Sequence, residues 1–141
     1  MLRPSHLPAC ARLYATVFNR APWNGRWTPK TARKHILESI GDTTFKGMIA
    51  VEGDTVVGFA YGSVSQWENE RRFFLKEMCV DGKRQGRGIG TRLLTNLIAR
   101  LKTQKVRRIS LGTGRNTPAR KFYLRLGFAV DSQAIIMNKR L

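Results

Sequence analysis

The sequence predicts a single α/β domain with helices on both faces of a mixed sheet. The chain has 141 residues, the usual size of one domain, and 42% of them are hydrophobic, enough to build one core. Apolar residues recur at helical spacing in four segments and form strand-like runs in six. After two helices come two strands, then strand, helix, strand and helix, then closing strands, an order typical of a three-layer architecture.

The first half predicts two helices and a hairpin. Residues at helical spacing form one apolar face of the first helix: Leu7, Cys10, Ala11, Tyr14, Val17 and Phe18. After a connector rich in Pro, Gly and Trp, Thr28 before Pro29 marks a helix start, and Gly41 is placed to end that helix. Two β-rich runs flank Glu52-Gly53-Asp54 in residues 48–64, which predicts a hairpin.

The second half predicts alternating strands and helices. Residues 73–80 read as a strand, and a glycine-rich turn leads from it into a helix with five residues on its inner face: Leu93, Leu94, Leu97, Ile98 and Leu101. Residues 107–113 form the next strand. A further helix begins at Pro118, capped by Asn116 or Thr117, and stops at Gly127. Residues 128–130 and 134–139 are expected to be closing strands.

The positive charge is concentrated in the second half. The chain has 26 Lys and Arg against 9 Asp and Glu, a net charge of +17. Residues 71–141 hold 18 basic and 3 acidic side chains, whereas residues 1–70 hold 8 and 6. Such a field attracts nucleic acid, acidic membranes or a phosphorylated ligand, although a solvated basic surface explains it equally well.

Several classes of protein are disfavoured. No apolar run approaches the roughly 18 residues of a membrane span. Cys10 and Cys79 are far apart among apolar neighbours, as reduced thiols of a cytoplasmic protein would be. His6 and His35 form no metal-binding pair, so we expect no metal. The arginine-punctuated N-terminal segment also has the composition of a mitochondrial transit peptide, but its apolar face favours a domain helix.

The glycine-rich turn is a candidate anion site. Gly86, Gly88 and Gly90 precede a helix, whose N-terminus presents unpaired N–H groups and a partial positive charge. Glycines leave those amides open and allow a positive φ, so a pyrophosphate is the natural ligand. The spacing excludes a Walker loop, because Thr91 and Arg92 follow the last glycine, and it departs from the dinucleotide pattern G-x-G-x-x-G.

The sequence Gln85-Gly86-Arg87-Gly88-Ile89-Gly90 resembles the Q/R-x-x-G-x-G/A signature of the GNAT superfamily of acyl-CoA N-acyltransferases. Val80, at the end of the preceding strand, stands eight residues before Gly88, as in that family. A second family element is matched by Asn116, Tyr123, Gly127 and Phe128. The two elements together cover residues 74–130. The segment FNRAPWNGRWT is similar to a bacterial subgroup, some members of which modify aminoglycosides.

The resemblance implies a fold for the single domain, residues 1–141, and assigns a different ligand to each half of it. It implies a mostly antiparallel sheet of six to seven strands, splayed at its middle and flanked by four helices, with a short or incomplete first strand. The splayed strands would be Leu75 to Val80 and Arg108 to Gly112. Residues 1–70 would form the acceptor side, and residues 71–141 would bind acetyl-CoA.

The resemblance also implies the site of the donor. The pantetheine arm of acetyl-CoA would pair with the first splayed strand, and the pyrophosphate would lie on the amides of the glycine loop, with Arg84 and Arg87 near the phosphates. The cofactor-binding residues would be Met78, Cys79, Val80, Gln85, Gly86, Arg87, Gly88, Ile89, Gly90, Thr91, Asn116, Ala119 and Phe122. Amides near Cys79 and Val80 would polarise the thioester carbonyl, and one such donor is worth roughly 3–4 kcal/mol of barrier.

Two catalytic residues follow from the same resemblance. Glu77, the only acid within its strand, would take the proton of the amine directly or through water, and Tyr123 would protonate the departing thiolate. Glu77 and Met78 face opposite ways along a strand unless a bulge intervenes. Glu77 has a second interpretation, as the partner of an arginine in an ion pair. Tyr123 also has a second interpretation, as a tyrosine packed in the core.

The acceptor side is rich in aromatic residues. Trp23, Trp27, Tyr61 and Trp67 are candidates for the acceptor pocket, because flat aromatic rings give large contacts at low entropic cost. Core packing explains each of them singly. Four acids of the first half could form a local acidic pocket for a polycationic acceptor: Glu52, Asp54, Glu68 and Glu70.

These residues predict an acetyl-CoA-dependent N-acetyltransferase acting on a small-molecule or peptide amine. One alternative is an acetyltransferase aimed at an RNA-associated acceptor, namely aminoacyl-tRNA or a ribosomal protein, which the basic charge favours. Another is a non-catalytic module of the CoA-binding fold that binds nucleic acid or a partner without turnover. The exposed closing strands allow a homodimer without requiring one.

Overall fold

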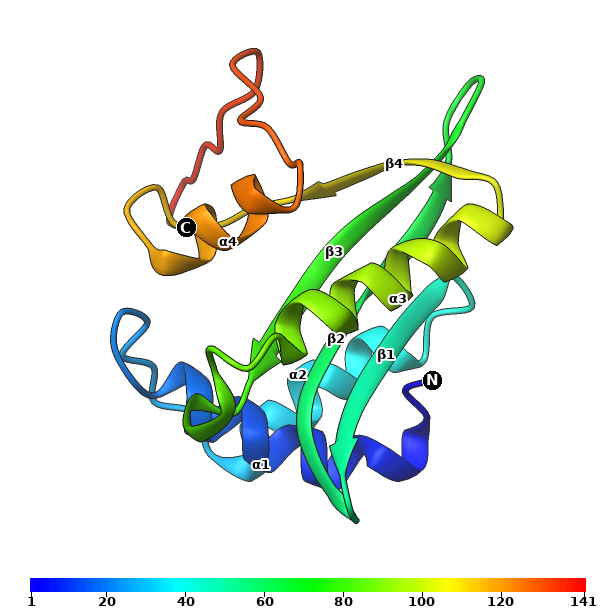
Figure 1. Ribbon diagram of the computed structural model, residues 1–141. Coiled ribbons are helices and arrows are strands. Elements are labelled where there is room, and N and C mark those ends of the chain that lie inside the picture. The colour runs from blue at the N-terminus through cyan, green and yellow to red at the C-terminus, as the bar shows by residue number, and fades with distance from the viewer.

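A computed structural model describes all residues 1–141, and a four-stranded sheet forms its middle layer (Figure 1). The strands lie in the order β1-β2-β3-β4. β1 (Phe45–Glu52), β2 (Thr55–Gln66) and β3 (Arg71–Val80) are antiparallel, and β4 (Val106–Leu111) is parallel to β3. The predicted hairpin is confirmed: Gly53 turns between β1 and β2 with a φ of 60°.

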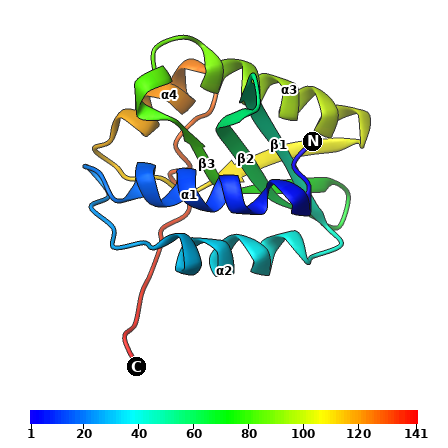
Figure 2. The same cartoon turned by 90° about the horizontal axis from the view of Figure 1, so that it is seen from below.

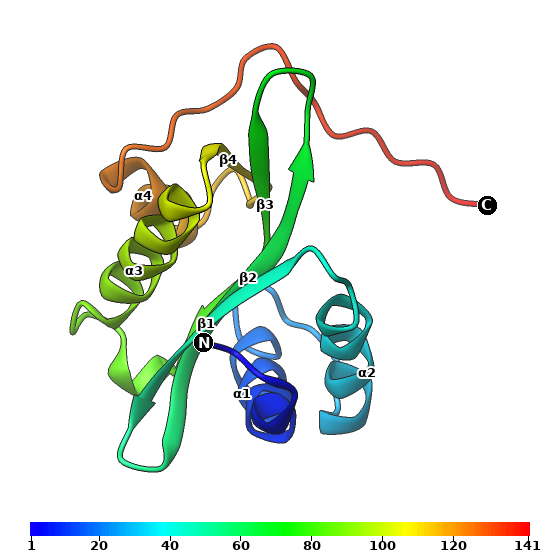
Figure 3. The same ribbon diagram turned by 90° about the vertical axis from the view of Figure 1, so that its right-hand side faces the viewer.

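Two helices cover each face of the sheet (Figure 3). α1 (Leu7–Phe18) and α2 (Pro29–Ile40) lie on one face, and α3 (Ile89–Thr103) and α4 (Pro118–Arg125) on the other. The short 3₁₀ helices η1 (Pro4–His6) and η2 (Gly82–Arg84) precede α1 and follow β3. None of these helices combines the length and the hydropathy needed to cross a bilayer. The predicted fold class, an α/β domain with four helices around a mixed sheet, is therefore confirmed.

The helix boundaries follow the signals in the sequence. Thr28 caps α2 by accepting a hydrogen bond from the Thr31 amide at 3.1 Å, with Pro29 in the first turn. Thr117, rather than Asn116, caps α4 and accepts from the Arg120 amide. Each sheet face has its own core: the α1 and α2 side buries Tyr14, Ile36, Phe59 and Tyr61, and the α3 side buries Phe73, Leu75, Leu94 and Leu97.

β3 and β4 separate halfway along β3. Their pairing runs from Arg71 opposite Val106 to Leu75 opposite Leu111 and stops there. Beyond the extra residue Lys76, the rest of β3, residues 77–80, pairs with β2 alone. The other edge of this segment therefore presents backbone groups that no strand satisfies, as the predicted splay requires.

A β-bulge at Lys76 changes which face the following side chains reach. Tyr61 of β2 is opposite Glu77, but the next residue, Gly62, is opposite Leu75, so Lys76 is the extra residue. Leu75 consequently packs in the α3-side core, whereas Glu77 reaches α1 and α2. Gly62 is required here, because a Cβ at this position would collide with the Phe74 carbonyl oxygen.

The predicted strand count of six to seven is wrong, since the sheet has four strands. Residues 128–130 and 134–139 form no strands, and the C-terminal segment runs away from the body of the protein (Figure 2). The runs are rich in β-forming residues, yet a strand exists only where a neighbour supplies backbone partners, and here none does. Ile135, Ile136 and Met137 are accordingly about 80% exposed. At the N-terminus, a single backbone bond from Leu2 to Gly47 stands in place of a first strand.

Candidate active site

A cavity lies where β3 and β4 separate. Its volume is about 550 Å³, within the range of small-molecule sites. α1 and the connector between α1 and α2 line one wall, and β3, the segment after β4 and α4 line the other, with Ile136 at one side. A smaller hollow of about 150 Å³ at the N-terminal end of β1 contains no carboxylate, imidazole or phenol. Glu77 and Tyr123, the two candidate catalytic residues, both line the larger of these two cavities.

Glu77 is held in this cavity by two side chains from the first half of the chain. Its Oε1 accepts a hydrogen bond from the Tyr14 hydroxyl at 3.1 Å and lies 2.8 Å from His35 Nε2. The Glu77 side chain is 19% exposed and that of His35 is 39% exposed. The expected ion pair between Glu77 and an arginine does not form. Tyr14 and His35 instead fix one oxygen of the carboxylate, and His35 extends the contact toward solvent.

Sequence reasoning missed Tyr14 and His35 as site residues. Tyr14 counted as one more apolar position on its helix face, and His35 as a histidine without a partner. Burial, and secondly the charge of Glu77, raises the pKa of Tyr14 well above that of a free phenol. The phenol therefore stays protonated and donates to the carboxylate. No local signal could have found this contact, because it joins residues 63 positions apart.

Tyr61 lies beside this group but does not reach the cavity. It is fully buried, stacked on Phe59 at 5.9 Å, and its hydroxyl has no hydrogen-bond partner. Burial raises its pKa strongly. Trp67 is also outside the cavity, on the turn between β2 and β3, with the Arg72 guanidinium 4.1 Å above its ring. Of the four aromatic candidates, the structure thus brings only Trp23 and Trp27 to the cavity.

Tyr123 reaches the cavity from α4. Its ring packs edge-on against Phe122 and Phe128, with centroids 5.2 and 5.5 Å apart. Burial raises the pKa of Tyr123 to about 12, with smaller contributions from Glu77 and Cys79. A phenol in this state keeps its proton at neutral pH and is able to donate it.

The glycine loop presents free amides at the start of α3. Gly86 and Gly88 have φ values of 80° and 76°, which a side chain at either position would strain. The first backbone bond of α3 runs from Arg92 to Gly88. The amides from Ile89 to Thr91 are therefore unpaired, as an anion-binding helix end requires. At Gly90 a Cβ would lie 3.4 Å from the Phe122 ring, an ordinary contact, so neither space nor backbone conformation requires glycine at this position.

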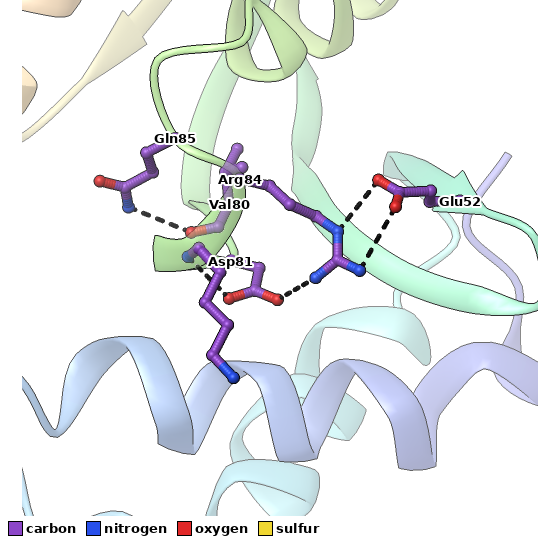
Figure 4. Close-up of polar contacts among 6 residues, drawn as sticks. Glu52, Val80, Asp81, Arg84 and Gln85 are labelled. Carbon is purple, nitrogen blue, oxygen red and sulfur yellow. Dashed lines mark hydrogen bonds and ion pairs between the residues drawn. The ribbon is translucent and has the colours of Figure 1, made fainter.

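Polar contacts fasten this loop to the end of β3 (Figure 4). The Arg84 guanidinium pairs with Glu52 at 3.0 Å and with Asp81 at 2.7 Å. Gln85 Nε2 donates to the Val80 carbonyl at 3.1 Å. Hydrogen bonding and the charge of Arg84 lower the pKa of Glu52. Arg84 is thus engaged within the protein, whereas the neighbouring Arg87 is exposed.

The remaining residues expected at the cofactor divide between two environments. Met78 and Ala119 line the cavity. Val80 and Cys79 belong to the part of β3 that does not pair with β4. The Cys79 side chain is buried against α1, and burial raises its pKa well above that of a free thiol. Asn116 is exposed and lies outside the cavity.

The expected acidic pocket does not form. Glu52 and Asp54 lie at the turn between β1 and β2, while Glu68 and Glu70 lie at the turn between β2 and β3. These turns are at opposite ends of β2, and none of the four carboxylates lines the cavity. No three His, Cys, Asp or Glu side chains are arranged to hold a metal ion.

Comparison with known proteins adds a family and a set of similar folds. The model of the acetyltransferase (GNAT) family matches residues 10–128. No curated protein matches the sequence. A transcriptional regulator from Bacillus halodurans C-125 is similar with a TM-score of 0.79 and 20% identity, over 98% of this chain and 96% of that one.

Two similar structures are named as aminoglycoside acetyltransferases. One, from an uncultured soil metagenomic sample and in complex with sisomicin, has a TM-score of 0.76 and 16% identity, over 99% of this chain and 93% of its own. The other, an aminoglycoside N-acetyltransferase in complex with CoA, has a TM-score of 0.78 and 20% identity, over 99% and 92%. At these identities the likeness is one of fold.

Proposed function

We propose that this chain, which belongs to the acetyltransferase (GNAT) family, transfers the acetyl group of acetyl-CoA to the nitrogen of a primary amine. The observation that carries the proposal is the unpaired edge of β3 leading to the free amides of the glycine loop. One cavity adjoins that edge and contains both a carboxylate and a protonated phenol. The presence of CoA in a structure of the same fold supports the choice of donor.

The residues present fit this donor. A diphosphate would accept hydrogen bonds from the amides of residues 86–91, which no protein group uses. Arg87 is the free guanidinium beside the loop. The backbone edge of residues 76–80 would pair with the amide-containing arm, and an amide near Cys79 or Val80 would stabilise the negative charge that develops on the thioester oxygen. Acetyl-CoA supplies the activated acyl group, and the chain holds and orients it.

Glu77 is proposed as the base. An ammonium group cannot attack, so a proton must leave the acceptor before the C–N bond forms. The carboxylate is in the cavity, and Tyr14 and His35 hold its Oε1, which fixes the direction of the other oxygen. Glu77 receives the amine proton directly or through one water molecule.

Tyr123 is proposed as the acid. As the C–N bond forms and the C–S bond breaks, the departing sulfur gains a negative charge, and the Tyr123 hydroxyl donates a proton to it. The elevated pKa of this phenol ensures that the proton is present at the start of each turnover. The tyrosine and the carboxylate line the same cavity, the one from α4 and the other from β3.

Two glycine variants distinguish loss of CoA binding at the glycine loop from a general effect of backbone strain. Gly88→Val is expected to abolish the heat of CoA binding in calorimetry and the release of thiol from acetyl-CoA with amine acceptors. Gly53→Val is the matched control, because Gly53 also has a positive φ, 60°, and open space around it, but lies on the β1–β2 turn. If the two variants bind CoA equally well, or if the unaltered protein gives no heat with CoA, the proposal fails.

A further inference from the structure

We infer that the acceptor is an amine that carries an aromatic ring and no second positive charge, an inference that rests on the proposed function. Two independent features of the cavity support it. The wall formed by α1 and the connector is a preformed aromatic surface, and the cavity as a whole contains a single carboxylate. The first feature selects the ring, and the second selects against further cationic groups.

The aromatic wall consists of four rings in contact. Tyr14 packs against Phe18 at 4.4 Å and edge-on against Trp27 at 5.0 Å, and Phe18 packs edge-on against Trp23 at 5.1 Å. All four rings line the cavity. Trp23 is 45% exposed, so its surface is available to a ligand. A flat aromatic group would extend this series of contacts.

The connector is held rigidly enough to form this wall without a ligand. Asn19 binds the backbone of Trp27 at both ends: its Oδ1 accepts from the Trp27 amide at 2.7 Å, and its Nδ2 donates to the Trp27 carbonyl at 2.8 Å. Gly25 donates to the Phe18 carbonyl at 2.8 Å, and a Cβ on Gly25 would lie as close to the Trp27 ring. A wall that is ordered in advance gives affinity without a further ordering cost.

The charges around the cavity fit one ammonium group. The charged side chains that line it are Lys76 and Glu77. Glu77 already contacts His35 through Oε1, so one carboxylate oxygen remains for the amine. A second ammonium group in the cavity would find no acidic partner and would be repelled by the exposed Lys76. Polyamines and aminoglycosides carry several such groups.

Four other carboxylates have partners elsewhere in the protein. Glu52 and Asp81 pair with Arg84, and Glu70 pairs with Arg72 and Arg108. Asp42 binds the amide and hydroxyl of Thr44, which lowers its pKa. None of these groups lines the cavity. The single ammonium group of the acceptor would therefore lie between Glu77 and the face of a tryptophan, where a cation is attracted by the ring.

A panel of three amines tests the two parts of the inference. The probes are 2-phenylethylamine, hexylamine and spermidine, each supplied with acetyl-CoA and followed by thiol release. The expected kcat/KM for 2-phenylethylamine is at least about tenfold higher than that for hexylamine, because hexylamine lacks the ring. It is also expected to be at least about tenfold higher than that for spermidine, because spermidine carries additional positive charges. A value for spermidine equal to or above that for 2-phenylethylamine overturns the inference and leaves acetyl transfer intact.

Two variants test whether the aromatic wall binds the ring of the acceptor. Trp23→Ala is expected to raise the KM for 2-phenylethylamine at least fivefold while leaving CoA binding unchanged. Leu37→Ala is the control, since Leu37 is equally exposed, at 44%, but lies on α2 outside the cavity. If both variants keep the original KM, the aromatic wall does not bind the ring and the inference is wrong.

Direct measurement of amine binding tests this inference independently of the proposed function. If no amine is acetylated by a protein that binds CoA, the proposed function fails, and calorimetry of the CoA-loaded protein with each amine then decides the inference. Binding of 2-phenylethylamine that Trp23→Ala weakens supports the aromatic site. Binding of spermidine alone, or of neither amine, overturns it.

Discussion

His35 Nε2 lies 2.8 Å from Glu77 Oε1, although 42 residues separate the two along the chain. The contact joins α2 to β3 and ends at a carboxylate that lines the cavity between β3 and α1. Tyr14 donates to the same oxygen from α1. A carboxylate fixed by two partners from two helices is positioned by the fold as a whole.

The contact predicts that His35 is a positioning residue. Replacing His35 with Leu is expected to lower kcat about tenfold, because a hydrogen bond to a charged group is worth about 1.5–3 kcal/mol, while the KM for acetyl-CoA stays unchanged. His35→Gln is expected to restore most of the rate, since its amide also donates to Glu77. Steady-state kinetics of both variants provides the test, and equal loss in the two would contradict a positioning role through hydrogen bonding.

Tyr123→Phe removes the proposed proton donor and keeps the ring. The rate of acetyl transfer is expected to fall about 100-fold, within the usual contribution of general acid catalysis, with CoA affinity nearly intact. Because the pKa of Tyr123 is raised to about 12, loss of its proton should not limit kcat of the unaltered enzyme below about pH 11. A rate profile from pH 7 to 11 and calorimetry with CoA check both statements. An unchanged rate in the variant would remove the acid role.

The buried thiols and phenols predict a loss of stability in alkali. Burial raises the pKa of Cys10 from 9.0 to about 12 and also raises that of Tyr61. Above pH 9 the unfolded chain releases protons that the folded chain keeps, so the free energy of unfolding falls as pH rises toward 12. Each such group contributes about 1.4 kcal/mol per pH unit.

Denaturant unfolding between pH 7 and 11 measures this slope. Cys10→Ala is expected to lower stability at pH 7 by removing packing, and to reduce the slope between pH 9 and 11 by about one proton. Stability of the unaltered protein that stays constant over this range would show that these groups ionise alike in both states.

Gly62→Ala tests the bulge that places Glu77. The added Cβ would collide with the Phe74 carbonyl, a backbone group that cannot rotate away, so a loss of about 2–4 kcal/mol of stability is expected. Gly41→Ala is the control: its Cβ would lie 3.7 Å from the Leu37 carbonyl, an ordinary contact. Urea unfolding of both variants gives the comparison, and equal stabilities would mean that the backbone at Gly62 has more room than the fold shows.

The sequence by itself determined the features that depend on neighbouring residues. Thr28 and Thr117 cap their helices through bonds to amides three residues on. Gly86 and Gly88 take the positive φ that the glycine-rich motif allows. Such interactions span a single turn, so the order of residues is enough to reveal them.

Only the tertiary structure decided which distant residues meet. Tyr14 and His35 converge on Glu77 because the bulge at Lys76 turns that side chain toward α1 and α2, and a bulge depends on the pairing of two strands. The same dependence explains why the segment around Ile135 and Ile136 is exposed despite its strong β-forming composition. A strand forms only where a neighbouring strand pairs with it, and a site forms only where separate elements pack together. Neither condition can be read from residues that are close together in the sequence.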